Sequence, residues 1–193
     1  MANINDFSFL KEAGFYKVYS SLEYAMQYYD RDAVICCKCF RDVMEDVIDE
    51  ILALVDHRSE NKSIKDIRTI EYVLMEIKYY DINTIVSELH NMRNLGNVYS
   101  HNTSDREPFK DRYTNYCAML KIGHWMIEFK KELPKYLERY EEEQRRRLRE
   151  EQQCKKEYEE KQRKKEKRNI ILTIGATILT IAGTIIGLKK MNE

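Results

Sequence analysis

Three polar side chains in the middle of the chain have the types and spacing that could act on a phosphodiester. Arg93, Asn97 and His101 recur at every fourth position, and on one helix they would share a face because each such step advances only about 40°. Arg can hold a phosphate through two parallel hydrogen bonds, and His can donate and accept protons near neutral pH. Together they could support metal-independent RNA cleavage with the 2′-hydroxyl as the nucleophile. The structural alternative is that Gly96 and Asn97 end a helix and His101 caps or packs there.

The segments that would position these residues are predicted to be helices. Gly and Pro are scarce, at six and two of 193 residues, and no alternating stretch is bounded by turn dipeptides. Apolar residues recur instead at spacings of three and four, most clearly over residues 33–54. The pattern predicts an all-α fold, with helices over residues 6–12, 15–29, 33–54, 64–80, 82–101 and 105–133.

Polar and helix-terminating residues predict the breaks between these helices. Residues 57–63 should form a loop and residues 102–107 a turn, while Asp81 and Asp105 should cap the helices that follow them. Pro134 should end or kink the last helix, since proline removes a backbone donor and its ring clashes with the preceding turn. The sequence therefore predicts a helical domain that stops at this residue.

A metal site is not expected in the helical domain. Cys36, Cys37 and Cys39 could be drawn as a zinc site with a histidine from elsewhere in the chain (His57, His90 or His124). However, thiols this close together on an amphipathic helix point to different faces, and Cys is a common core residue. We expect neither a metal nor a cofactor.

Short motifs along residues 5–132 suggest a family. They are an Asp-Phe-Ser-Phe-Leu run at residues 6–10, then Glu23 and a Tyr-Asp-Arg-Asp turn at 29–32 followed by Arg41 and Glu45, and finally Arg93, Gly96, Asn97 and His101 in the pattern R-x-x-G-N-x-x-x-H. In these features the chain resembles the HEPN superfamily, specifically the HEPN-like helical domains of bacterial restriction and defence proteins. The resemblance implies an antiparallel HEPN-like helical bundle that dimerises, often with the closing motif at the interface. It also implies Arg93, Asn97 and His101 as the candidate catalytic residues.

The chain departs from the family's ribonucleases at one position. Those enzymes resemble one another in carrying an Arg shortly before the His, whereas here Gly96 occupies that place and Arg93 lies one turn earlier. The departure favours a non-enzymatic role, and a HEPN-type endoribonuclease is the alternative.

Residues 135–169 have a different character from the helical domain. They carry fourteen Lys and Arg against ten Glu, whereas residues 1–134 have a net charge of −5, which argues against a general nucleic-acid binder. Glu precedes Arg or Lys by four positions seven times, and each such pair adds about 0.2–0.5 kcal/mol to an isolated helix. We expect a solvated helical spacer about 52 Å long. Its last basic residues should contact lipid headgroups: Lys161, Arg163, Lys164, Lys165, Lys167 and Arg168.

Residues 170–188 are predicted to span a membrane. They contain only Ile, Leu, Thr, Gly and Ala, and as a helix they would reach about 28 Å, close to the thickness of the bilayer hydrocarbon. Small residues form one stripe, which favours close approach of two helices in lipid. These packing residues are Thr173, Thr177, Thr180, Gly183, Thr184 and Gly187. Residues 189–193 form a short tail.

The same features predict where the protein acts. The opening ten residues lack the basic start and apolar run of a signal peptide, and five Cys suit a reducing compartment. The basic flank before residue 170 should stay on the cytoplasmic side. We expect a single-pass tail anchor in the inner (cytoplasmic) membrane with the N-terminal domain in the cytoplasm.

The resemblance and the anchor together predict a membrane-bound effector of prokaryotic antiphage or stress defence. It would bind a cytoplasmic partner through the helical domain and act by homo-oligomerisation and membrane perturbation. One alternative is a membrane-tethered HEPN ribonuclease, for which RNA would be the substrate. The other is a non-enzymatic adaptor that places a cytoplasmic partner at the membrane.

Overall fold

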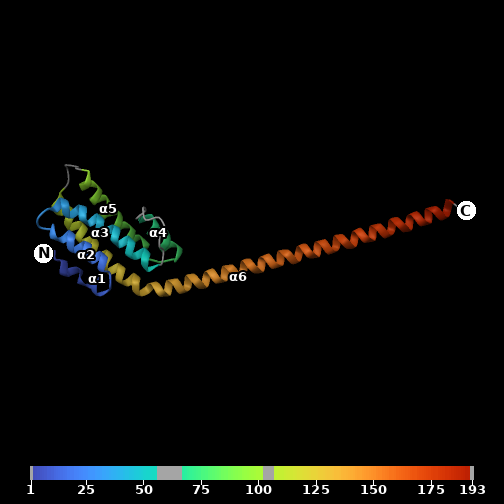
Figure 1. The fold of residues 1–193 in the computed structure, drawn as a ribbon, viewed down its shortest axis with the longest axis horizontal. Coiled ribbons are helices and arrows are strands. Elements are labelled where there is room, and N and C mark those ends of the chain that lie inside the picture. The colour runs from blue at the N-terminus through green and yellow to red at the C-terminus, as the bar shows by residue number, and fades with distance from the viewer. Residues whose placement is uncertain (1, 56–66, 102–106, 192–193) are drawn as a thin grey trace. The chain divides into compact units, whose positions relative to one another are not determined.

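The computed structural model describes residues 2–55, 67–101 and 107–191, with side chains as far as Ile174. Over these residues every regular element is a helix (Figure 1), which confirms the all-α fold class. The chain divides into two units, residues 1–140 and 141–193. In chain order the elements are the 3-10 helix η1 (Ile4–Phe7) and the helices α1 (Ser8–Glu12), α2 (Tyr16–Gln27), α3 (Ala33–Leu54), α4 (Ile67–Glu76), α5 (Ile82–Ser100) and α6 (Pro108–Met191).

Helix α3 is the centre of the first unit, because it packs against both α2 and α5. It begins where the sequence predicts, and Asp32 caps it by accepting hydrogen bonds from the N–H groups of Val34 and Ile35 at 3.0 and 2.9 Å. The predicted apolar stripe is buried from Ala33 to Ile51. The stripe is wider than predicted, since the residues beside it are buried too: Cys36, Cys39, Val43 and Ile48.

The first part of α6 closes the core with aromatic side chains. Phe129 is fully buried, stacks on Trp125 at 4.8 Å between ring centroids, and meets the Tyr79 ring edge-on at 5.0 Å. The indole Nε1–H of Trp125 donates to the carbonyl oxygen of Asp81 at 3.2 Å. These contacts fix the segment between α4 and α5 against α6.

Two expectations about helix ends hold only in part. Helix α6 continues through Pro134, so the proline does not end it, and the first compact unit extends to Tyr140. The neighbours of the proline, Leu133 on one side and Tyr136 on the other, pack on the core, and this packing holds the helix across the missing hydrogen bond. Asp81 lies at the N-cap position of α5, but its side chain makes no capping hydrogen bond. The predicted loop 57–63 and the predicted cap Asp105 lie outside the described residues.

In the second unit, residues 141–174 of α6 have exposed side chains almost throughout. Two of the predicted charge pairs form, Arg145 with Glu141 at 3.2 Å and Arg147 with Glu143 at 2.8 Å. No helix among the residues described is both long enough and apolar enough to span a bilayer. Most of the predicted span, residues 175–188, lies outside the described side chains, so this expectation stays a prediction.

Candidate functional site

The structure places the three residues of the predicted catalytic motif at the C-terminal end of α5. Arg93 and Asn97 lie within the helix, which ends at Ser100, and His101 follows as its C-cap residue with φ −111° and ψ 19°. Arg93 and His101 are exposed and Asn97 is half-buried. The pockets described below are lined by other residues. The catalytic role of the three therefore stays a prediction.

Gly96 stands where HEPN ribonucleases carry an Arg, and in this structure it has a packing role. It is buried, and a Cβ atom added to it would lie 2.7 Å from the Cβ of Arg41 on α3. Real Cβ atoms do not approach that closely, so any larger residue would push α3 and α5 apart. The Arg41 stem crosses α5 at this point, and its Nε lies 3.8 Å from Glu45 Oε1. Gly96 is thus required by the close approach of α3 and α5. The residues next to it in the sequence do not indicate this requirement.

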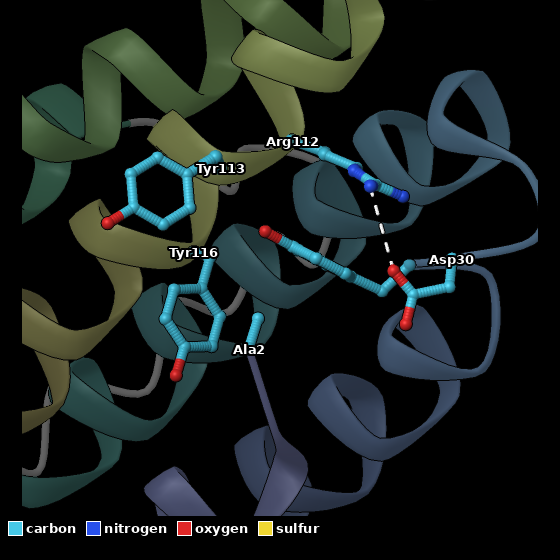
Figure 2. A pocket seen from close by; sticks show the side chains of 6 residues that line it. Ala2, Asp30, Arg112, Tyr113 and Tyr116 are labelled. Atoms are coloured by element: carbon cyan, nitrogen blue, oxygen red, sulfur yellow. Dashed lines mark ion pairs between the residues drawn. The ribbon is translucent and has the colours of Figure 1, made fainter.

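A site that the sequence did not predict lies at the start of α6. A cavity of about 490 Å³ opens there, and Figure 2 shows Arg112, Tyr113 and Tyr116 projecting from one helix with Asp30 facing Arg112. The lining residues are Ala2, Tyr29, Asp30, Arg112, Tyr113 and Tyr116. The cavity thus combines a guanidinium group with three tyrosine rings.

The guanidinium of Arg112 is held between two aromatic rings. Its central carbon lies 4.4 Å from the centroid of the Tyr29 ring and 4.9 Å from that of Phe109. Cation–π contact of this kind is attractive and leaves the edge of the group for hydrogen bonds. The arginine side chain is only 15% exposed, so the rings and the surrounding helices fix its position.

The hydrogen-bonding capacity of Arg112 is largely unused. Its Nε and Nη1 are buried and have no hydrogen-bond partner among the described residues. Its Nη2 lies 3.6 Å from Asp30 Oδ1, longer than the roughly 2.7–2.9 Å of a charge-assisted hydrogen bond. The Asp30 side chain is 86% exposed, so this ion pair is open to water and easily displaced. The edge of the guanidinium that carries Nη2 can therefore donate a hydrogen bond to a better-placed anionic oxygen.

A second hollow continues the cavity along the molecule. Its volume is about 470 Å³, and it shares Ala2, Tyr29 and Asp30 with the first. Its other lining residues come from the N-terminal segment and the end of α2: Asn3, Ile4, Glu23, Met26 and Gln27. The two hollows adjoin at these shared residues, and we call them together the Arg112 groove.

The tyrosines of the groove act as neutral groups. Burial, together with the hydrogen bond that its hydroxyl donates to Asp6 Oδ2, raises the pKa of Tyr116 to about 12. Burial also raises the pKa of Tyr29, although the charge of Arg112 opposes the rise. Both phenols therefore stay protonated near neutral pH and act as hydrogen-bond donors and not as bases.

The cysteines of α3 are core residues. Cys36, Cys37 and Cys39 are buried, and burial raises the pKa of both Cys36 and Cys37 to about 12. Neutral thiols of this kind do not bind metal or attack electrophiles. Within the described part of the chain, no three His, Cys, Asp or Glu side chains gather as a metal site would require.

The residues predicted to meet the membrane are described only in part. The six predicted headgroup contacts between Lys161 and Arg168 are all exposed on α6. Thr173, the first of the predicted packing residues, is exposed and its hydroxyl donates to the carbonyl oxygen of Asn169 at 2.8 Å. The remaining packing residues lie outside the described side chains: Thr177, Thr180, Gly183, Thr184 and Gly187.

One signal in the sequence could have identified the Arg112 groove. Phe109, Arg112, Tyr113 and Tyr116 follow a helical spacing of three, four and seven, which gathers an arginine and three aromatic rings on one side of a helix. The contribution of Tyr29 and Asp30 has no such signal, because they come from a turn about eighty residues earlier. Comparison of the chain with protein-family models, with curated proteins and with solved structures found no match.

Proposed function

We propose that this chain is a membrane-anchored HEPN-like effector of prokaryotic antiphage or stress defence. In this proposal the first unit binds a cytoplasmic partner, residues 141–169 hold it off the inner membrane, and residues 170–188 cross the bilayer. Partner binding gathers several copies, and their anchors then perturb the membrane. The resemblance in residues 5–132 supports the defence context, and the arrangement of the second unit supports the anchor.

The observation that carries the proposal is the uncharged stretch that follows a highly charged helix. Its first apolar side chains are 54–68% exposed, although Ile and Leu belong in a core or in lipid: Ile170, Ile171, Leu172 and Ile174. The run of nineteen uncharged residues contains ten Ile and Leu, and as an exposed helix it would have more apolar surface than a soluble monomer usually exposes. Lipid would cover this surface, and a helix satisfies its own backbone groups there.

The charges before the stretch support the same arrangement. Six exposed basic residues lie between Lys161 and Arg168, against one acidic residue, Glu166. Each basic side chain near an anionic leaflet contributes about 1 kcal/mol of attraction. They would fix the cytoplasmic end of the anchor, with the acidic first unit farther from the surface.

Membrane insertion is tested by fractionation of cells that express the full chain. We expect the protein in the membrane pellet, resistant to alkaline carbonate, and released only by detergent. A variant lacking residues 170–188 should be soluble. As a matched control, Ile178→Leu keeps the apolar character and should stay in the pellet. Recovery of the full chain as a detergent-free soluble monomer would overturn the proposal.

The mode of action is tested by dye entry and membrane depolarisation after induction. The double variant Gly183→Leu, Gly187→Leu removes the small residues that permit close helix contact and should abolish permeabilisation, while Ile178→Leu should not. If the chain is inserted but causes no permeabilisation, an adaptor role replaces effector action. If total RNA is cleaved and His101→Ala and Arg93→Ala prevent this, a tethered ribonuclease replaces it.

A further inference from the structure

We propose that the Arg112 groove binds an extended peptide segment of the partner protein, with a carboxylate of the peptide on the Nη2 edge of Arg112 and a neighbouring apolar side chain beside Ile4 and Met26. The inference depends on the proposed function only in identifying the owner of the peptide with the partner of the helical domain. The binding chemistry is argued from the groove alone.

The guanidinium determines the charge of the ligand. Arg112 has no hydrogen bond of normal length to any described residue, and its only ionic neighbour is Asp30 at 3.6 Å. Because Nε and Nη1 are buried, a ligand would meet the guanidinium at Nη2, where a closer anionic acceptor than Asp30 would form a stronger charge-assisted hydrogen bond. One guanidinium matches one negative charge, which is that of a carboxylate.

Asp30 shows how the carboxylate would enter. Its own carboxylate faces Arg112 from the exposed turn between α2 and α3, and its side chain is 86% exposed. It therefore occupies the position of the ligand oxygen with poor geometry and full access to water. A peptide carboxylate that makes a shorter hydrogen bond can displace it without disturbing the core.

The shape of the groove favours an extended chain over a compact ion. The two hollows, of about 490 and 470 Å³, share three lining residues, whereas a single carboxylate or phosphate would fill a small part of either. Phe109 and Tyr113, beside Arg112, are 69% and 58% exposed, and the second hollow is lined by Ile4 and Met26. Exposed aromatic side chains around an arginine are typical of the centre of a protein interface.

The charges around the groove argue against a polyanion. Glu23 and Asp30 both line it, and residues 1–134 carry a net charge of −5. A nucleic acid or an anionic membrane surface would meet repulsion over most of this unit and attraction at one arginine. A peptide with one or two acidic residues meets little repulsion.

The test begins with a random peptide library displayed on phage and the full-length protein in detergent micelles. The protein is immobilised by its C-terminal end, because Ala2 lines the groove. We expect the enriched peptides to share an Asp, a Glu or a free C-terminal carboxylate next to an apolar residue. Enrichment of peptides without a carboxylate, or of none at all, would overturn the proposal.

Synthetic versions of the enriched peptide then identify the carboxylate. Three fluorescent forms are compared by anisotropy: one with the side-chain carboxylate and a C-terminal amide, one with the free C-terminal carboxylate alone, and one with Gln and an amide. Binding by the first or the second identifies the source, and equal binding by all three contradicts the proposal. Displacement by inorganic phosphate or acetate at concentrations comparable to that of the peptide would show a small-anion site instead.

Variants of the groove provide the decisive comparison. Arg112→Gln should weaken peptide binding at least about tenfold, because it removes a charged donor, and Arg112→Lys should weaken it less. The matched control is Arg139→Gln on the same helix, where the guanidinium carbon stands 6.0 Å from the Tyr136 ring and outside the groove; it should leave affinity unchanged. Circular dichroism melts of each variant check that the fold is retained.

Asp30→Asn separates a binding role of Arg112 from a structural one. Loss of the competing carboxylate should strengthen binding of the acidic peptide by about two- to fivefold, the usual range for an exposed ion pair. If Asp30 and Arg112 only stabilised the turn, the variant would bind no better, and that result would count against the proposal. Peptide binding in micelles can succeed while membrane insertion in cells fails, so failure of one proposal is distinguishable from failure of the other.

Discussion

Residues 108–140 and 141–174 belong to one helix, α6, but different forces stabilise the two regions. The first region buries one side in a core of aromatic and aliphatic residues, including Met119, Trp125 and Phe129. The second buries almost nothing and is supported by charge pairs one turn apart, such as Glu141 with Arg145. Packing contributes kilocalories per residue, whereas each exposed pair contributes tenths. The first region can therefore hold a binding groove in a fixed geometry, and the second can serve as a spacer whose sequence is constrained only in its charge.

The largest expected difference between the two regions comes from truncating one apolar side chain in each. Phe129→Ala should lower the free energy of unfolding by about 3–5 kcal/mol, because it removes a fully buried ring and leaves a cavity. Leu148→Ala, at an exposed position, should change it by less than about 0.5 kcal/mol. Urea denaturation followed by circular dichroism measures both. A similar effect of the two changes would mean that the second region is packed as well.

The second comparison uses the cysteines and pH. Burial raises the pKa of Cys36 and Cys37 from an ordinary value of 9.0 to about 12, so above pH 9 the unfolded chain releases protons that the folded chain retains. This stabilisation is complete below pH 9 and is lost as the pH rises toward 12. Near pH 10 the loss should be about 1.4 kcal/mol for each thiol.

The control for this pH dependence lies in the second unit. Unfolding titrations of Cys36→Ala and Cys37→Ala should show a flatter alkaline limb than those of the unaltered chain. Cys154→Ala should not change the limb, because Cys154 is exposed. If Cys154→Ala flattened it equally, the assignment of the alkaline transition to buried thiols would fail.

An effect smaller than that of Phe129→Ala is expected from adding a methyl group where α3 and α5 approach each other. Gly96→Ala should destabilise the first unit by about 1–3 kcal/mol, since the added methyl would meet the Cβ of Arg41, an atom fixed to the backbone. Asn94→Ala, on the exposed side of the same helix, should stay within about 0.5 kcal/mol of the unaltered chain. Thermal melts decide between them. A neutral Gly96→Ala would show that α5 shifts away without loss.

The smallest effect concerns the charge pairs of the second region. Glu141→Gln removes the partner of Arg145, which lies 3.2 Å away, and should weaken the local helix by about 0.2–0.5 kcal/mol. Backbone hydrogen exchange near residue 145 should quicken by about twofold at low salt. High salt should erase the difference, because the pair is exposed and screened. Persistence of the difference in high salt would point to a contact other than an ion pair.

The sequence predicts the parts of the fold that depend on local periodicity. Residues 33–54 repeat the same apolar spacing for the whole length of the helix, so its bounds and the centre of its buried face follow from the pattern, although not the full width of that face. Pro134 does not end α6, because Leu133 and Tyr136 on either side of it pack on the core. Tertiary packing of this kind can override a local helix breaker.

The candidate site could not be predicted from local sequence patterns for a similar reason. The Arg112 groove is lined by three segments, residues 2–4, 23–30 and 112–116, that are far apart in the sequence. Only the last has an internal spacing that gathers its members. Gly96 shows the same limit, since its requirement comes from Arg41 on another helix. A single sequence indicates well which face of each helix is buried. It indicates poorly which of those faces pack against one another.

Trp125 gives the first unit its own optical signal. It is the single tryptophan in 193 residues, and its indole lies in the core with Nε1–H bonded to the carbonyl oxygen of Asp81. Tryptophan emission, excited selectively over that of the fourteen tyrosines, therefore reports the unfolding of residues 1–140. A tryptophan fluorescence measurement can follow the folding of this unit in micelles, vesicles or buffer without an added label.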